Sequence, residues 1–160
     1  MMVSHTNTGK IISCKDGALA SYGALTMFIP MLMDTGGNSG GQASVTVIRA
    51  LSLGELRLRD LPRVLWKELR VAVLCAGTLC AAVFAKAMLL DRQSVMVAVV
   101  VSITVFLTVC IAKLVGCTLP MLAKRLGFDP AVMASPFITT VVDALSLLVY
   151  FAVAGRLLGI

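Results

Sequence analysis

The segment AVMASPFITTVVDALSLLVYFAVAGRLLGI, residues Ala131–Ile160, shows what class of fold this chain adopts. It is apolar over a length that can cross a bilayer, since a membrane helix needs about 20 such residues. Asp143 lies about 12 residues from its start, or about 18 Å along a helix, and so near the middle of a membrane. A carboxylate at that depth costs about 2.5–3.5 kcal/mol on insertion scales, so it faces protein, water or a cation rather than lipid. An ion path is therefore the first hypothesis.

The composition extends this conclusion to the whole chain. Of the 160 residues, 59% are hydrophobic and 14% are charged, whereas a soluble domain has roughly 45–50% apolar residues even when glycine is included. We therefore expect an all-α integral membrane protein with about four transmembrane helices. That plan leaves no room for a soluble catalytic domain, and the sequence holds no nucleotide-binding, zinc or Ser/His/Asp motif. We expect no enzyme activity.

The net charge of +6 is better explained by membrane orientation than by nucleic-acid binding. Basic residues gather between Arg49 and Arg70 and again at Lys124 and Arg125, next to apolar spans. Under the positive-inside rule both segments face the cytoplasm, and four crossings then place both termini outside. The expected location is a bacterial-type plasma (inner) membrane, with the lipid bilayer and no nucleic acid as a partner.

The chain divides into a polar N-terminal segment, residues 1–16, and a transmembrane cation-transport domain, residues 17–160. The first apolar stretch contains Pro30, is interrupted by a glycine-rich segment at residues 35–42, and resumes at residues 43–53. Proline and clustered glycine both disfavour a regular helix, so we predict that this first helix is interrupted. The other three spans are expected at residues 69–90, 95–122 and 131–160.

Local signals mark the ends of the later helices. Asp60 and Pro62 predict the start of an amphipathic helix that runs directly into the second span. Gly127 suits a helix C-cap, while Asp129 and Pro130 suit the N-cap and first turn of the fourth span. Pro136 would then lie one turn inside that span and should bend it.

The glycine-rich segment carries a polar stripe. Asn38 is flanked by Asp34 and Gln42 at i−4 and i+4, so the three side chains share one face of a helix. Such a stripe is costly against lipid and is solvated in a pore. The alternative is plain helix packing, for which glycines four residues apart provide close-contact ridges. We predict as pore-lining in this segment Asp34, Gly36, Gly37, Asn38, Gly40, Gly41 and Gln42.

A second polar stripe runs along the last span. Its members lie on one face of a helix and are Ser135, Thr139, Asp143, Ser146 and Tyr150. We interpret Asp143 as an ion site, with Ser135 and Ser146 lining the pore. The alternative is a structural pair between Asp143 and an intramembrane base. Lys113 is then the better partner, because Lys86 is close enough to its helix end to reach the membrane surface.

Two stretches strongly resemble the MgtE magnesium transporter family. One is PMLMDTGGNSGGQ at residues 30–42, followed by VIRAL at 47–51 and LGEL at 53–56. The other is LPMLAKRLGFDPA at residues 119–131, followed by SPF at 135–137 and TTVVD at 139–143. The resemblance implies an MgtE-type transmembrane domain, a homodimer, and a pore for Mg²⁺ between the subunits, lined chiefly by the first and fourth spans.

The resemblance also implies roles for single residues. Asp143 matches the aspartate of the family's ion site, and Thr139 lies where a backbone carbonyl contributes to it. Asn38 and Ser135 fall at polar positions along the path, Ser135 in place of the asparagine of some members. Mg²⁺ is thus the expected cargo and ligand, although oxygen ligands also accept other divalent cations.

Family members generally carry cytoplasmic N-terminal and CBS domains and a further, first transmembrane helix. The resemblance covers none of these here, so we expect the transmembrane part without that helix. Two other functions stay open at this point: a cation exchanger coupled to Na⁺ or H⁺, and a non-conducting structural membrane subunit.

Overall fold

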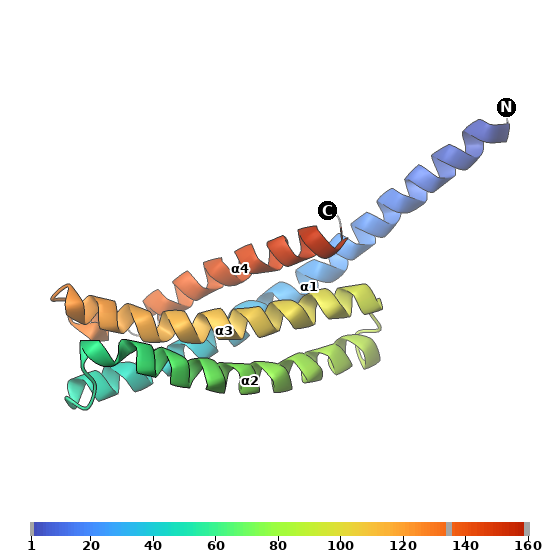
Figure 1. Ribbon diagram of the computed structural model, residues 1–160. Helices are drawn as coiled ribbons and strands as arrows, with labels where there is room; N and C mark the ends of the chain where they lie inside the picture. Colours follow the sequence, from blue (N-terminus) through green and yellow to red (C-terminus); the bar gives the residue numbers. More distant parts are fainter. Residues whose placement is uncertain (1, 134–135, 159–160) are drawn as a thin grey trace.

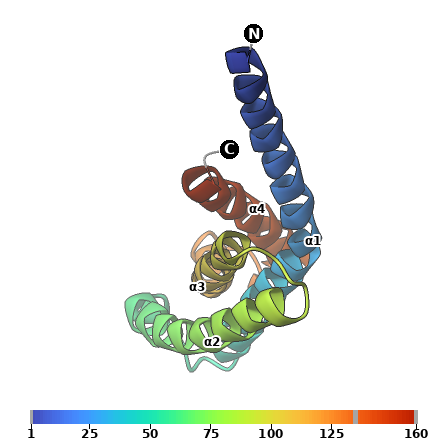
Figure 2. The same ribbon diagram turned by 90° about the vertical axis from the view of Figure 1, so that its right-hand side faces the viewer.

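The computed structural model describes the backbone of residues 2–133 and 136–158 and the side chains of residues 23–131 and 136–158. Its elements are α1 Met2–Ser52, the 3-10 helix η1 Leu58–Asp60, α2 Leu61–Leu89, α3 Val95–Arg125, the 3-10 helix η2 Pro130–Met133 and α4 Pro136–Leu158. Figures 1 and 2 show α3 in the centre of the bundle, where it contacts the other three long helices, while α1 also packs against α4. The buried core follows this arrangement, since α3 holds most of the buried valines.

The predicted fold class, an all-α membrane protein, is confirmed. Three helices are long and apolar enough to cross a membrane, namely Leu58–Leu89, Val95–Arg125 and Pro136–Leu158. Within the described residues α1 is not among them, since Asp34, Asn38, Gln42 and the glycines lower its hydropathy, and its crossing stays a prediction. The expected start of the second helix is confirmed, because Asp60 precedes α2 and Pro62 lies in its first turn.

The predicted interruption of the first helix is wrong. α1 is one continuous helix that includes both Pro30 and the glycine-rich segment, although it curves along its length in Figure 2. Each glycine costs a helix about 1 kcal/mol relative to alanine, but the missing side chains here permit close packing. A Cβ added to Gly40 would lie 3.0 Å from Val142 Cγ2 and 3.1 Å from the carbonyl oxygen of Ala112. Contact with α3 and α4 therefore keeps this segment helical.

The start of the fourth span also differs from its prediction. Residues 130–133 form η2, and α4 begins only at Pro136. Asp129 still serves the turn, since its Oδ1 accepts a hydrogen bond from the Ala131 N–H at 2.9 Å, and Gly127 has the positive φ of 83° expected of a C-cap. As the first residue of α4, Pro136 has no helical hydrogen bond to break. The predicted bend one turn inside the span is wrong for this reason.

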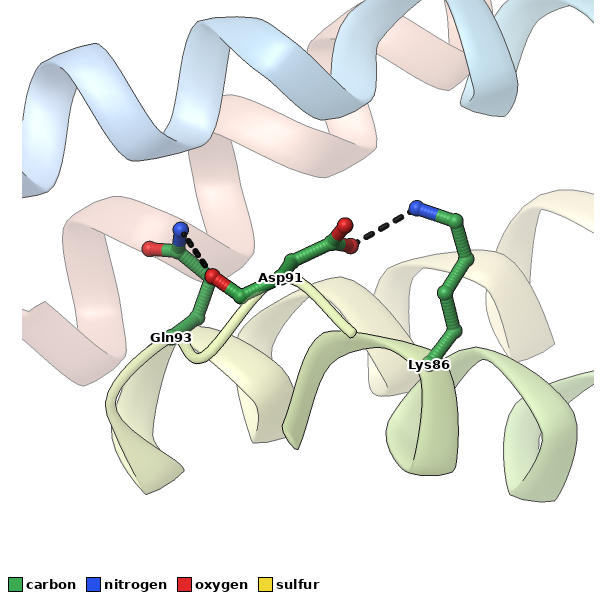
Figure 3. A network of polar contacts seen from close by, with 3 residues as sticks. All are labelled: Lys86, Asp91 and Gln93. Atoms are coloured by element: carbon green, nitrogen blue, oxygen red, sulfur yellow. Dashed lines mark hydrogen bonds and ion pairs between the residues drawn. The ribbon is translucent and has the colours of Figure 1, made fainter. Parts of the chain in front are cut away.

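The turn between α2 and α3 is tied to α1 by one lysine. Figure 3 shows Lys86 pointing to Asp91, with 2.7 Å between its Nζ and Oδ2, and the Gln93 amide donating to the Asp91 carbonyl at 3.0 Å. The same ammonium lies 5.6 Å from the ring centre of Phe28 on α1, in cation–π range. The lysine that we expected to reach the membrane surface therefore pairs with the turn that connects two spans.

The contact between α1 and α3 gives a stability prediction. A Cβ at Gly116 would overlap the backbone of Gly40, so we expect Gly116→Ala to lower the free energy of unfolding by about 1–3 kcal/mol. Gly77→Ala in α2 is the matched control, because a Cβ there meets nothing within 4 Å. It should be neutral or stabilise by up to about 1 kcal/mol, since alanine favours a helix. Thermal unfolding in detergent measures both, and equal melting temperatures would contradict the close contact.

Candidate cation site

A groove of about 780 Å³ lies between α1 and α4. It is lined by Met33, Asp34, Gly37, Asn38, Gly41, Gln42, Val45, Thr46, Thr139 and Asp143. Seven of these ten were predicted as site residues from the sequence. The polar side chains on the α1 side are exposed in the single chain, so the groove opens on the outside of the bundle rather than into its core.

One wall is a polar ladder on α1, made of Asp34, Asn38, Gln42 and Thr46 at every fourth residue. Because α1 stays helical, all four side chains share one face over about 18 Å. Asn38 Nδ2 donates to Asp34 Oδ1 at 3.0 Å, and Thr46 Oγ1 donates to the Gln42 carbonyl oxygen at 3.0 Å. Thr46 was not predicted, although its spacing extends the stripe by one turn and could have revealed it.

The other wall is formed by Thr139 and Asp143 on α4. The Oδ1 atom of Asp143 is buried and has no hydrogen-bond partner among the described residues. It lies against α1, since a Cβ added to Gly37 would be 3.5 Å from this oxygen and 2.9 Å from Thr139 Cγ2. Burying a charged oxygen without a donor costs at least about 1–3 kcal/mol. A cation or its water shell is the kind of ligand that would remove this cost.

Two further members of the α4 stripe, Ser146 and Tyr150, lie inside the bundle. Ser146 is buried and donates its hydroxyl to the Val142 carbonyl at 2.7 Å. Tyr150 is buried too, and its hydroxyl donates to the Leu25 carbonyl of α1 at 2.8 Å. Of the stripe residues that the structure describes, Thr139 and Asp143 line the groove, whereas Ser146 and Tyr150 do not.

Three residues predicted to line a pore lie in helix contacts beside the groove. Gly36 faces Ser146, where an added Cβ would be 2.8 Å from the serine Oγ, and Gly40 packs against α3. Ser135, which was also predicted as pore-lining, lies outside the described residues.

Lys113 does not pair with Asp143. Its Nζ lies 3.3 Å from Oε2 of Glu68 on α2, with the two side chains only 12% and 15% exposed. Lys86 is likewise engaged by Asp91. Among the described residues no base forms an ion pair with Asp143. The structural alternative, a buried Asp143–Lys113 pair, is therefore wrong.

Within the described ranges no group of three or more His, Cys, Asp or Glu side chains is placed to hold a metal ion. Mg²⁺ commonly keeps several waters and binds through one or two carboxylates, so a groove with carboxylate, amide and hydroxyl groups is compatible with the hydrated ion.

Comparison with known proteins agrees with this geometry. Residues 29–153, which include both walls of the groove, match the MgtE family of divalent cation transporters. The chain belongs to this family. MgtE proteins are transporters and not enzymes, as the sequence led us to expect.

Two MgtE relatives illustrate the match. The chain is 38% identical over 151 residues to the magnesium transporter MgtE of Thermus thermophilus and 35% identical over 147 residues to that of Bacillus subtilis. These alignments cover 94% and 92% of this chain but 33% and 32% of the two relatives. The chain thus spans about a third of the length of the curated MgtE proteins that it matches.

The pairing of Lys113 gives a second prediction for this MgtE-family chain. Lys113→Met should lower the free energy of unfolding by about 3 kcal/mol, because Glu68 is left buried and unpaired, and Glu68→Met in the same chain should recover most of that loss. Asp143→Asn should act independently of Lys113→Met, within about 0.5 kcal/mol. Denaturant unfolding of the single and double variants measures the coupling of residue 113 with residue 68 and with residue 143. A strong coupling between residues 113 and 143 would contradict the assignment of partners.

Proposed function

We propose that this chain conducts divalent cations, above all Mg²⁺, through a pore shared by two copies, with Asp143 at the ion site. The observation that carries the proposal is the buried, unpartnered Oδ1 of Asp143 in the wall of a polar groove. Membership of a divalent cation transporter family supports it, as do relatives that are themselves magnesium transporters.

The exposed polar side chains of the groove support a homodimer. Asp34, Asn38 and Gln42 lie on the outer surface of the single chain, where acyl chains would leave them unsolvated. A second copy, related by a twofold axis normal to the membrane, would cover this surface with the same surface of its own. Two facing grooves would then form one water-filled path, and each chain would supply half of it.

The paired site suits a hydrated divalent ion. Two Asp143 carboxylates would face the same path, and Mg²⁺ usually binds one or two carboxylates while keeping a near-octahedral water shell. Thr139, through its backbone carbonyl, would add an oxygen beside them, as the family resemblance implies. No covalent step is involved. The membrane potential favours inward movement by about 2.3 kcal/mol per charge for each 100 mV.

The Asp34–Asn38 hydrogen bond determines which end of the Asn38 side-chain amide can face the proposed ion path. An ionised carboxylate only accepts hydrogen bonds, so the Asn38 nitrogen faces Asp34 and the amide oxygen is left for other donors. That oxygen can accept from the water shell of a cation, whose waters donate outward. Asp34 has no ion-pair partner in the described part of the chain, so it also adds a second negative charge to each half of the path.

The ion-site assignment is tested by Asp143→Asn. We expect Mg²⁺ uptake into proteoliposomes, followed with an enclosed Mg²⁺ indicator, to fall at least tenfold, because asparagine keeps the shape but not the charge. Chemical cross-linking should show that the dimer still forms. The matched control is Asp129→Asn, which removes a carboxylate from the exposed loop before η2 and keeps the oxygen that accepts from Ala131.

Undiminished uptake by Asp143→Asn would defeat the assignment, and a similar loss in both variants would point to a general effect of charge. Uptake that requires an opposing Na⁺ or H⁺ gradient would show that the same carboxylate serves an exchanger instead of a channel.

A further inference from the structure

A pocket at the basic end of the bundle contains two arginines from different elements. It has a volume of about 280 Å³ and is lined by Leu58, Arg59, Leu61, Met121, Leu122 and Arg125. Arg59 belongs to η1, and Arg125 is the last residue of α3. The remaining four lining residues are leucines and a methionine. The pocket therefore has two arginines among its lining residues and is otherwise apolar.

Neither arginine has an acidic partner in the described part of the chain, where every ion pair joins other residues. Asp60, next to Arg59 in the sequence, is engaged elsewhere: its Oδ2 accepts from the Arg57 N–H at 3.0 Å, and its Oδ1 lies 4.0 Å from Arg63. Both arginines line this pocket and are exposed, so the positive charge that they bring to it would attract an anion. The charge pattern therefore favours an anionic ligand.

The pocket also lies where lipid headgroups are expected. Figure 1 places the start of α2 and the end of α3 at the same end of the bundle, the end that the positive-inside rule assigns to the cytoplasm. Trp66, a little further along α2, is 62% exposed, as is typical of an aromatic anchor at a membrane interface. Leu58 and Leu122, each 40% exposed, offer apolar surface beside the two arginines.

We propose that this pocket binds an anionic phospholipid, with Arg59 and Arg125 on its headgroup phosphate. Guanidinium groups bind phosphate through paired, charge-assisted hydrogen bonds, and the leucine and methionine walls would contact the adjoining acyl chains. Basic pockets between transmembrane helices on the cytoplasmic side recognise such headgroups. A bound lipid would join η1 to the end of α3, and the proposal does not depend on which ion the protein carries.

The proposal is tested by native mass spectrometry of the purified chain titrated with phosphatidylglycerol and, separately, with phosphatidylcholine. The wild-type chain should retain phosphatidylglycerol preferentially. The double variant Arg59→Gln/Arg125→Gln should have a dissociation constant for phosphatidylglycerol at least tenfold higher. The matched control Lys67→Gln/Arg70→Gln removes the same charge from the exposed surface of α2 outside this pocket. Its dissociation constant for phosphatidylglycerol should differ from that of the wild type by less than about twofold.

Three outcomes would overturn the proposal. Equal weakening in both double variants would show diffuse attraction to the basic surface, equal retention of the two lipids would show no headgroup recognition, and equally tight binding of inorganic phosphate would show a site for a soluble anion. Should the glutamine pair fail to fold, Arg59→Lys/Arg125→Lys keeps the charge but loses the planar fork. It should weaken binding several-fold with an unchanged circular dichroism spectrum, and unchanged affinity would overturn the proposal as well.

Discussion

A carboxylate inside an apolar helix needs an opposite charge, donors or water, and this requirement governs how the two walls of the groove are arranged. The two lysines within the spans do not meet it, because Glu68 binds Lys113 and Asp91 binds Lys86. Asp143 instead lines the groove between α1 and α4, and its buried Oδ1 lies against Gly37 of α1. In the proposed pore, a passing cation and its waters would supply the charge and the hydrogen-bond donors that Asp143 lacks in the single chain.

The glycine-rich segment makes this arrangement possible because one of its faces packs against other helices and the opposite face lines the groove. On one face Gly36 and Gly40 bring α1 against α3 and α4 at distances that a side chain would not allow. On the other face the side chains of Asp34, Asn38 and Gln42 stand in the groove. Helix packing and the polar groove, the two interpretations of this segment of sequence, therefore lie on opposite sides of one helix. Gly37 lies at the border, where the α1 backbone meets Thr139 and Asp143.

Much of this could be predicted because the patterns are local. Helical periodicity placed five groove residues on two helix faces, and hydropathy gave the three strongest spans; the five are Asp34, Asn38, Gln42, Thr139 and Asp143. What failed depends on tertiary contacts. Glycine and proline content predicted a break in α1, whereas packing against α3 keeps it helical. Pro136 was predicted to kink the last span because no sequence signal marks the short helix η2 that precedes α4. The partner of Lys113 is 45 residues away on α2, a choice that no spacing rule could make.

The most direct test of the central claim is an anomalous scattering map of crystals grown from lipid in the presence of Mn²⁺, which has oxygen-ligand preferences like those of Mg²⁺. The account predicts a symmetric dimer with a metal peak on its twofold axis, between the two Asp143 carboxylates and flanked by Asn38 of both chains. A dimer joined through another surface, with Asp143 facing lipid or contacting a basic side chain and no metal beside it, would contradict the account.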